Sequence, residues 1–438
     1  MKTSSTSKFI VKPGGKLHGT LRVPGDKSIS HRAIMLGAVA SGTTQVNGFL
    51  EGEDTLATLA ALKAMGVSIL RSTNGQITIH GVGLHGLQAP KTPLDLGNSG
   101  TSMRLLSGLM AGQTFSVEMR GDASLSNRPM RRVTEPLHQM GALISTSAKD
   151  TPPLKIHGNQ HLQGIDYTMP IASAQVKSCL LLAGLYASGT TCITSPAPTR
   201  DHTERMLIGF GYPLKQKGQH VCIQGGGKLQ AHSIEVPADI SSAAFFMVGA
   251  SIAQGSEVWL QHVGINPTRI GVITILRQMG ANISLHNQRE VSGEPVADIR
   301  VCASDLHGIN IPKDQVPLAI DEFPILFIAA ACASGTTVLT GASELRVKES
   351  DRILVMAEGL QAIGIDAQPT PDGMIIQGGK MHGSVINSHG DHRVAMAFTM
   401  AALRASDIIT IEDCANVTTS FPNFINLAKI AGLMVSLS

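Results

Sequence analysis

Apolar and polar positions along this sequence follow a pattern that recurs about every 70 residues. In each period, an Ala- and Leu-rich stretch typical of a helix leads to an ASG-type marker, and a β-branched run that predicts a strand follows. Identical ASGTT markers and weaker copies of them begin at Ala40, Ala111, Ala187, Ala253, Ala333 and Ala405. We expect the glycine of this marker to end the preceding helix.

A second series of markers has the same period. It consists of amphipathic helical stretches that end at a glycine, as in LKAMG and LRQMG. The glycines of this series are Gly66, Gly141, Gly211, Gly280, Gly364 and Gly432. Because 438 residues divided by six gives 73, two independent series with this step indicate six repeats. Each repeat is predicted to contain two helices and several strands, and its length disfavours a solenoid and favours two groups of three α/β units.

The predicted helix starts carry most of the polar residues that could do chemistry. The first helix of each repeat is expected to begin within residues 25–32, 97–104, 172–178, 238–244, 319–324 and 389–395. The second helices are expected to begin near Asn127-Arg128, Arg200-Asp201, Lys348-Glu349 and Thr419-Ser420. A helix N-terminus with basic residues is a ready anion site. Several such sites together would bind a ligand with more than one phosphate or carboxylate.

Composition narrows the class of protein. Hydrophobic residues make up 43% and charged residues 15%, so the chain can bury a large core and is not expected to be disordered. The apolar stretch 323–333 is shorter than the roughly 18 residues that a membrane helix needs. A net charge of +3 with 3% aromatic residues gives no support to a nucleic-acid surface. The first 15 residues lack an apolar signal region, so we expect a cytoplasmic protein.

The cysteines give the same expectation about the compartment. All six are scattered along the chain, and no CxxC pair occurs. Most have apolar neighbours, which predicts reduced, buried thiols and neither a disulfide framework nor a zinc site. They are Cys179, Cys192, Cys222, Cys302, Cys332 and Cys414.

Two motifs in the first half of the chain are candidate anion sites. GDKSISHR places Lys27, Ser28 and Arg32 on the first turns of one helix, although a capped surface helix with Asp26 or Ser28 as N-cap explains it equally well. GNSGTSMR places Gly100 where backbone N–H groups can approach an anion closely. The alternative there is an ordinary turn capped by Asn98 or Thr101.

Further candidates follow in the next two motifs. Arg128 precedes a proline at a predicted helix start, whereas Arg131 and Arg132 fit a solvated charged face. Ser173 and Gln175 stand at the start of an apolar helix, where simple capping is the alternative to ligand binding.

The second half contains the acidic candidates. Asp321 and Glu322 interrupt an apolar run, which is costly unless they are bonded or titrate for a purpose. Like charges on Lys348 and Arg352 at helical spacing indicate that an anion neutralises them, with a salt-bridged surface turn as the alternative. The two histidines and the aspartate of HGDHR could suggest a metal site, but further ligands at suitable spacing are lacking. Arg393 is therefore better interpreted as an anion clamp.

Taken together, these motifs resemble one family, 5-enolpyruvylshikimate-3-phosphate synthase, in family order and over nearly the whole chain. They are GDKSISHRA, LGNSGTSMRLL, GDASLSNRPM, SAQVKS, RDHTERML, AIDEFPIL, RVKESDR and GDHRVAMA. The resemblance implies an α/β fold: a two-lobed inside-out barrel of six βαβαββ repeats, three per lobe, with the active site in the interdomain cleft. We expect one lobe at residues 23–239, and the other at 1–22 plus 240–438.

The resemblance also implies a reaction. The enolpyruvyl group of phosphoenolpyruvate is transferred to the 5-hydroxyl of shikimate 3-phosphate with release of phosphate, without a metal or other cofactor. It implies small-molecule substrates, no nucleic acid or membrane partner, and a monomer. Asp321 is implied as the base, Glu349 as the acid and Lys348 as a contact of the reacting hydroxyl. The implied substrate contacts are Lys27, Ser28, Arg32, Asn98, Gly100, Arg128, Ser173, Ala174, Gln175, Arg200, Asp321, Lys348, Arg352 and Arg393.

The sequence departs from the best-known glyphosate-sensitive pattern at two places. Thr419 and Ser420 stand where that group has a lysine, and Leu105 replaces its proline; both features resemble the second class of the family. Alternatives are UDP-N-acetylglucosamine enolpyruvyl transferase, which normally carries a reactive cysteine in the first lobe, or a non-catalytic anion-binding scaffold. No cysteine precedes Cys179 here, and RNA 3′-phosphate cyclases would need nucleotide features that this sequence lacks.

Overall fold

The computed structural model describes residues 7–72 and 75–438. This part of the chain forms two compact units, each with its own hydrophobic core. Unit 1 comprises residues 7–24, 237–290 and 295–438, and unit 2 comprises residues 25–236 and 291–294. The sequence placed the changes of lobe after residues 22 and 239, and it gave no sign that the segment 291–294 belongs to unit 2.

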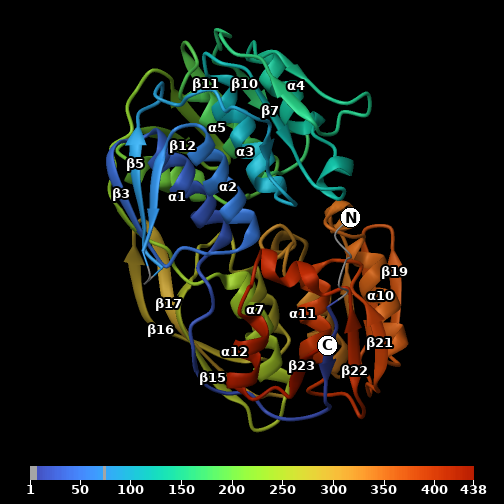
Figure 1. The fold of residues 1–438 in the computed structure, drawn as a ribbon. Coiled ribbons are helices and arrows are strands. Elements are labelled where there is room, and N and C mark those ends of the chain that lie inside the picture. The colour runs from blue at the N-terminus through green and yellow to red at the C-terminus, as the bar shows by residue number, and fades with distance from the viewer. Residues whose placement is uncertain (1–6, 73–74) are drawn as a thin grey trace. The chain divides into compact units, whose positions relative to one another are not determined.

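The described part of unit 2 contains three copies of one βαβαββ arrangement (Figure 1). The first consists of α1 (Lys27–Val39), β3 (Ser41–Asn47), α2 (Glu53–Ala64), β4 (Ser68–Arg71), β5 (Ile77–Val82) and β14 (Ser233–Glu235). The second consists of β6 (Leu94–Asp95), α3 (Gly100–Ala111), β7 (Val117–Arg120), α4 (Arg131–Gln139), β8 (Ile144–Ser145) and β9 (Leu154–Ile156). The third consists of β10 (Asp166–Thr168), α5 (Ala174–Gly184), β11 (Thr190–Thr194), α6 (His202–Gly209), β12 (Leu214–Lys217) and β13 (His220–Gln224).

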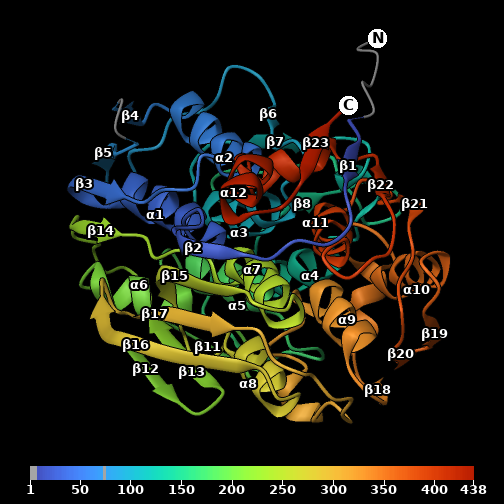
Figure 2. The same ribbon diagram turned by 90° about the horizontal axis from the view of Figure 1, so that it is seen from below.

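Unit 1 repeats the arrangement in its described residues. One copy consists of β2 (His18–Leu21), α7 (Ile240–Ile252), β15 (Glu257–Gly264), α8 (Gly271–Gln278), β16 (Asn282–Val291) and β17 (Glu294–Cys302), the last two forming a long hairpin (Figure 2). The next consists of α9 (Phe323–Cys332), β18 (Thr336–Leu339), α10 (Arg352–Ala362), β19 (Asp366–Thr370) and β20 (Gly373–Gln377). The last consists of β21 (Ser384–Asn387), α11 (His392–Ala401), β22 (Ile409–Glu412), α12 (Phe424–Ala431), β23 (Val435–Leu437) and β1 (Phe9–Val11).

Strand pairing confirms that the copies are true repeats. The described residues form six small sheets, and each four-stranded sheet has one parallel pair followed by two antiparallel pairs. In the three-stranded sheet β18–β20–β19, two isolated parallel bridges occupy the place of the fourth strand. They join His307 to Ser334, just before β18, and Asn310 to Val338 on β18. The predicted α/β fold of six repeats is therefore confirmed.

The first helix of each repeat lies in the core of its unit. Every residue of α7 is buried, as expected for a helix that is apolar on all sides. In unit 2, α3 packs against α5 (Figure 1), and in unit 1, α9 packs against α7 and α11. This packing brings the polar N-terminal turns of each unit's first helices close to one another.

The glycines of the two marker series differ in where they lie relative to the end of the preceding helix. All six glycines of the second series have positive φ, from +77° at Gly211 to +114° at Gly432, so they end their helices in the left-handed conformation, as predicted. The prediction for the ASG marker was wrong for α1 and α9. These helices already end at the C-caps Ala40 and Ala333, so the glycine lies two residues beyond the cap. In the weaker copy that begins at Ala111, Gly112 is the C-cap of α3, as predicted.

Three second helices begin later than the sequence suggested. Short 3₁₀ turns precede them: η1 (Leu125–Asn127) before α4, η3 (Ser343–Val347) before α10, and η4 (Ala415–Thr419) before α12. Arg128, Lys348 and Ser420 each follow such a turn directly, so they occupy the same place in three repeats. The polar residues that were expected to start helices therefore lie on turns in front of them.

The prediction of reduced thiols was wrong for two of the six cysteines. Cys192 on β11 and Cys222 on β13 form a disulfide, because the antiparallel register places them directly opposite each other. Their separation of 30 residues carries no local signal in the sequence. The other four cysteines are free thiols, as predicted, with Cys179 and Cys414 buried and Cys302 and Cys332 half-buried.

Burial affects the chemistry of two of the free thiols. It raises the pKa of Cys332 and of Cys414 to about 12, so neither is a reactive thiolate at neutral pH. Over the stretches 7–72 and 75–438, no helix is both long enough and apolar enough to cross a membrane.

Candidate active site

The N-terminal turn of α1 presents the first candidates in unit 2. Asp26 caps this helix, with Oδ1 accepting a hydrogen bond from the N–H of Ile29 at 2.9 Å, so Ser28 is not the cap. Lys27 Nζ lies 3.0 Å from Oδ2 of Asp54 on α2. The lysine is thus held at the helix start by a carboxylate, with 21% of its side chain exposed.

Arg32, one turn further along α1, is almost completely buried. Its Nε donates to Thr203 Oγ1 at 2.6 Å, and its Nη2 donates to Ser178 Oγ at 2.7 Å. Burial lowers the pKa of the guanidinium to about 10; nearby carboxylates, including Glu204, oppose this and Arg200 adds to it. The charges of Arg32 and Arg200 in unit 2 therefore act on each other.

The N-terminus of α3 joins several predicted residues. Arg128 Nη2 donates to Asn98 Oδ1 at 2.7 Å. A Cβ built on Gly100 would lie 3.1 Å from Nη1 of Arg128 and 3.2 Å from Nη1 of Arg104. The absence of a side chain at Gly100 thus lets two guanidinium groups lie directly against a helix N-terminus, where each attracts an anion.

Helix α5 completes this cluster. Ser173 caps it, with Oγ accepting from the N–H of Val176 at 3.3 Å, and Ala174 is its first residue. Gln175 does not cap: its Oε1 accepts from Arg104 Nη1 at 2.6 Å, and its Nε2 donates to Thr101 Oγ1 at 3.0 Å. Of the two alternatives for this motif, capping thus applies to Ser173 and not to Gln175.

Sequence reasoning missed Arg104. It lies four residues after Gly100 on α3, so helical spacing places both on one face, and this is the signal that could have found it. Arg131, by contrast, is exposed and lies 3.4 Å from Glu135, in keeping with a solvated charged face.

In unit 1, the predicted acidic and basic residues meet at Asp321. Its Oδ1 lies 3.1 Å from Lys348 Nζ and 3.5 Å from Arg352 Nη1, and its backbone oxygen accepts from Arg393 Nη1 at 2.7 Å. The anion that neutralises the like charges of Lys348 and Arg352 is thus a carboxylate of the chain itself. Glu349 joins the cluster by accepting from Arg352 Nη2 at 2.6 Å.

A buried carboxylate that the sequence did not identify holds Arg352. Asp391, fully buried, accepts from Arg352 Nε at 2.8 Å and also caps α11 through the N–H of Arg393. Burial opposes the charge of Arg352, but Asp391, Glu349 and Asp321 outweigh it and raise the pKa of the guanidinium. In turn, Arg352 overcomes the effect of burial on Asp391 and lowers the pKa of that carboxyl. The HGDHR segment therefore caps α11 through Asp391, and the same carboxylate holds Arg352 in place.

Glu322, the neighbour of Asp321, plays a different part. It is buried and accepts a short hydrogen bond from the hydroxyl of Ser241, which itself accepts from Arg269 Nη2 at 2.6 Å. Arg393 Nη1 lies 3.5 Å from Glu322 Oε1. The two neighbouring carboxylates therefore differ in their surroundings: Asp321 is partly exposed, whereas Glu322 is buried and has a structural part.

Thr419 and Ser420, which the resemblance places where the glyphosate-sensitive group has a lysine, also differ from each other. Thr419 is buried, and its hydroxyl donates to the backbone oxygen of Asn416 at 2.7 Å. Ser420 Oγ lies 3.3 Å from Nε2 of His392 on α11. Of the two, Ser420 is the more accessible residue and follows the 3₁₀ turn as Lys348 does.

These features define the class. The chain has an α/β fold of six βαβαββ repeats, with clustered guanidinium groups at helix N-termini in unit 2 and an acid–base cluster around one carboxylate in unit 1. Such a set is suited to group transfer between small anionic molecules.

Comparisons with known proteins identify the family. The family model for EPSP synthase (3-phosphoshikimate 1-carboxyvinyltransferase) matches residues 11–427. The 3-phosphoshikimate 1-carboxyvinyltransferases of Nitrosococcus oceani and Methylococcus capsulatus are 68% and 66% identical, covering 99% and 98% of this chain and 98% of each relative. The 2.37 Å structure of EPSP synthase from Acinetobacter baumannii has a TM-score of 0.90 at 60% identity, covering 99% of this chain and 100% of that one. The chain belongs to the EPSP synthase family, and its function is 3-phosphoshikimate 1-carboxyvinyl transfer in the shikimate pathway.

Proposed function

We propose that the clusters of the two units act on the same pair of substrates, phosphoenolpyruvate and shikimate 3-phosphate. Guanidinium groups bind carboxylate and phosphate through paired hydrogen bonds, and helix N-termini add a positive field. For shikimate 3-phosphate we propose Lys27, Ser28, Arg32, Asn98, Ser173, Ala174, Gln175 and Arg200. For phosphoenolpyruvate we propose Lys27, the Gly100 backbone, Arg128, Arg352 and Arg393.

The hydrogen bonds of Arg32 indicate how this residue would contribute to substrate binding. Each of its three nitrogens already contacts an acceptor of the protein: Thr203, Ser178 and the backbone oxygen of Ser28. We therefore propose that Arg32 acts chiefly through its charge and by fixing the start of α1, while the more exposed Lys27 and Arg200 contact phosphate directly.

The observation that carries the catalytic proposal is the position of Asp321 between two cations. Lys348 and Arg352 favour the ionised carboxylate, which can accept the proton of the 5-hydroxyl. Lys348 can also stabilise the negative charge that develops on that oxygen. Asp321 retains 15% exposure of its side chain, so it is held in place without being sealed from a substrate.

Glu349 is the proposed acid. A proton from Glu349 adds to the methylene carbon of phosphoenolpyruvate, and the neighbouring carbon gains cationic character and is attacked by the hydroxyl oxygen, whose proton passes to Asp321. Glu349 then takes a proton back from the new methyl group, which re-forms the double bond as the carbon–oxygen bond to phosphate breaks, and the proton held by Asp321 passes to the departing phosphate. In the structure, Glu349 is bonded to Arg352. We propose that the substrate carboxylate takes over this arginine, which frees Glu349 to carry a proton.

Phosphate release tests the proposal. Purified protein with phosphoenolpyruvate and shikimate 3-phosphate should release one phosphate per enolpyruvyl group transferred. The same protein with UDP-N-acetylglucosamine as acceptor should release none, and a preference for the UDP-sugar would refute the acceptor assignment. An Asp321→Asn control identifies release that does not depend on the proposed base.

We further propose that the enzyme works as a monomer in the cytoplasm. All residues proposed for both substrates come from one chain, so the chemistry does not require a second copy. Sedimentation of the purified protein over a range of concentrations tests this, and dimer formation at assay concentrations would contradict it.

A further inference from the structure

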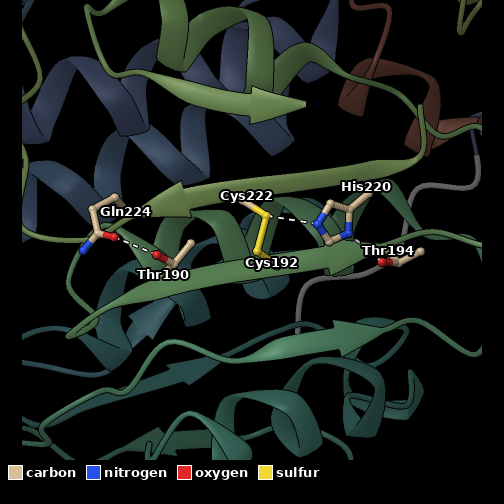
Figure 3. The surroundings of a disulfide bond; sticks show 6 residues. All are labelled: Thr190, Cys192, Thr194, His220, Cys222 and Gln224. Carbon is tan, nitrogen blue, oxygen red and sulfur yellow. Dashed lines mark hydrogen bonds between the residues drawn. A yellow bond between two sulfur atoms is a disulfide. The ribbon is translucent and has the colours of Figure 1, made fainter. Parts of the chain in front are cut away.

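The third sheet of unit 2 carries a cluster that the proposed reaction does not use. Cys192 lies on β11, and His220 and Cys222 lie on β13 (Figure 3). Their ligand atoms, two sulfurs and one ring nitrogen, all lie within 4.8 Å of one another. In the described stretches 7–72 and 75–438, this is the only group of three His, Cys, Asp or Glu side chains so arranged.

We propose that Cys192, Cys222 and His220 form a binding site for one zinc-type divalent cation, which opens when the Cys192–Cys222 disulfide is reduced. Two thiolates and one imidazole are the protein ligands of known zinc sites, in which water or a further ligand occupies the fourth position. The disulfide excludes the cation because its sulfurs are bonded to each other.

The backbone holds the three ligands in place. Cys192 and Cys222 are direct partners in the antiparallel ladder, with Cα atoms 4.1 Å apart. His220 stands two residues before Cys222, on the same face of the strand. The side chains of Cys192, Cys222 and His220 are half-buried. Ile193, the residue that follows Cys192 on β11, is buried on the opposite face of the sheet.

The orientation of His220 supports metal binding. Its Nδ1 lies 2.9 Å from Thr194 Oγ1, and its Nε2 points at Cys222 Sγ, 3.1 Å away (Figure 3). A metal-ligating histidine is typically held in this way, with one ring nitrogen fixed by a polar neighbour and the other directed at the ion. Two sulfurs bound to one tetrahedral zinc at about 2.3 Å each lie roughly 3.8 Å apart, which is within the 4.8 Å that spans the three ligand atoms here.

Neighbouring strands define the surroundings of the site. Asp166 on β10 pairs with Cys192, and Lys215 on β12 pairs with Cys222, so each faces the same side of the sheet. The carboxylate of Asp166 is not among the ligand atoms within 4.8 Å of one another, so its proposed part is to hold a water molecule on the cation.

The redox step balances with a dithiol as reductant. Two electrons and two protons from the dithiol convert the Cys192–Cys222 disulfide into two thiols, and the reductant becomes a disulfide. Binding of one Zn²⁺ then displaces both thiol protons to solvent.

The test compares oxidised and reduced protein, and needs no variant. After anaerobic reduction with a phosphine, which is then removed, the protein should take up one Zn²⁺ against a chromophoric chelator, and the oxidised protein none. Co²⁺ in place of Zn²⁺ should give a thiolate-to-metal charge-transfer band in the reduced protein alone. Equal zinc uptake by both forms, or none by the reduced form, overturns the proposal.

Variants then assign the ligands. Cys192→Ser, Cys222→Ser and His220→Gln should each weaken zinc binding by more than the roughly 10–100-fold that loss of an outer-shell partner costs. Thr194→Val, which removes the partner of Nδ1, should weaken it within that range. Cys302→Ser and Cys332→Ser remove half-buried free thiols elsewhere and should leave uptake unchanged. If these two reduce uptake and the first three do not, the site is elsewhere and the proposal fails.

Discussion

Lys348 and Asp321 form an ion pair, with Nζ 3.1 Å from Oδ1, although 27 residues separate them in the sequence. Each stands just outside a regular helix: Asp321 in the turn before α9, and Lys348 after the 3₁₀ turn that precedes α10. Residues on such turns can be held firmly while keeping one side open to a ligand. The pair therefore joins the proposed base to the cation that would stabilise the attacking oxygen.

Replacing Asp321 by Asn tests the base. The amide keeps the shape of the side chain but cannot accept the proton, so kcat should fall by roughly 10²–10⁴ while substrate binding largely survives. Steady-state phosphate release and substrate titration measure the two effects. Asp314→Asn, at an exposed position of the same segment, is the matched control and should behave as wild type. Near-normal turnover in Asp321→Asn would exclude Asp321 as the base.

Much of this architecture could be predicted from local sequence. The six repeats were predictable because the apolar pattern and the helix-ending glycines depend on local backbone preferences that recur with the period. Helix starts such as that of α1 were predictable because a cap such as Asp26 acts within three residues.

Contacts between distant elements could not be predicted. The Arg104–Gln175 bond and the Cys192–Cys222 disulfide join residues 71 and 30 positions apart, and their formation depends on helix packing and on strand register. Asp391 was missed because its sequence context resembles a histidine-rich metal site, whereas its position in the fold makes it the buried partner of Arg352.

The buried Arg352–Asp391 pair should be important for stability. Arg352→Met leaves Asp391 charged and without its main partner in the core of unit 1, and should lower the free energy of unfolding by about 3–5 kcal/mol. Denaturant titration measures this. Arg300→Met, which breaks the exposed pair with Glu257, should change it little. Adding Asp391→Asn to Arg352→Met should recover part of the loss; no recovery would show that lost packing, and not the unpaired charge, dominates.

His31 should make stability depend on pH. Burial, together with the charges of Lys27 and Arg32, lowers its pKa well below the ordinary value of 6.5. The folded state therefore favours the neutral ring, and its contribution is fully present above about pH 6.5 and is lost as pH falls through the folded pKa.

Denaturant titrations at several pH values test this effect. Below about pH 6.5, wild type should lose up to about 1.36 kcal/mol of unfolding free energy per pH unit from this group. His31→Gln, which keeps a polar atom near Thr58 Oγ1, should lack that part of the slope, and the exposed-site variant His161→Gln should retain it. Identical slopes in wild type and His31→Gln would rule out His31 as the source.

Ser420→Lys tests the missing lysine. Ser420 follows a 3₁₀ turn in the same way as Lys348, so a lysine there would present its ammonium group in front of α12. A charge-assisted contact is worth about 1.5–3 kcal/mol, so glyphosate should inhibit the variant roughly ten- to hundredfold more strongly. Inhibition constants against phosphoenolpyruvate measure this, with Thr418→Lys as a neighbouring control. Equal inhibition of Ser420→Lys and wild type would show that position 420 is not the lysine site.

Gly100→Ala tests where the inhibitor binds. The new Cβ would lie 3.1 Å from Nη1 of Arg128 and 3.2 Å from Nη1 of Arg104, both tips of flexible side chains. The fold should therefore tolerate the change, while the two guanidinium groups shift by a few tenths of an ångström and the space beside the helix N-terminus becomes smaller. Glyphosate, which competes for the phosphoenolpyruvate site in this family, should bind more weakly, and the KM for phosphoenolpyruvate should rise less.

The matched control is Gly209→Ala, at the end of α6. A Cβ there would meet His232 at an ordinary contact distance of 3.4 Å, so both constants should remain at wild-type values. Inhibition constants and KM for the two variants decide between outcomes. If Gly100→Ala leaves glyphosate inhibition unchanged, the inhibitor does not bind against Gly100. If KM rises as much as the inhibition constant, Arg128 and Arg104 contact both ligands equally, and tolerance has to come from another residue.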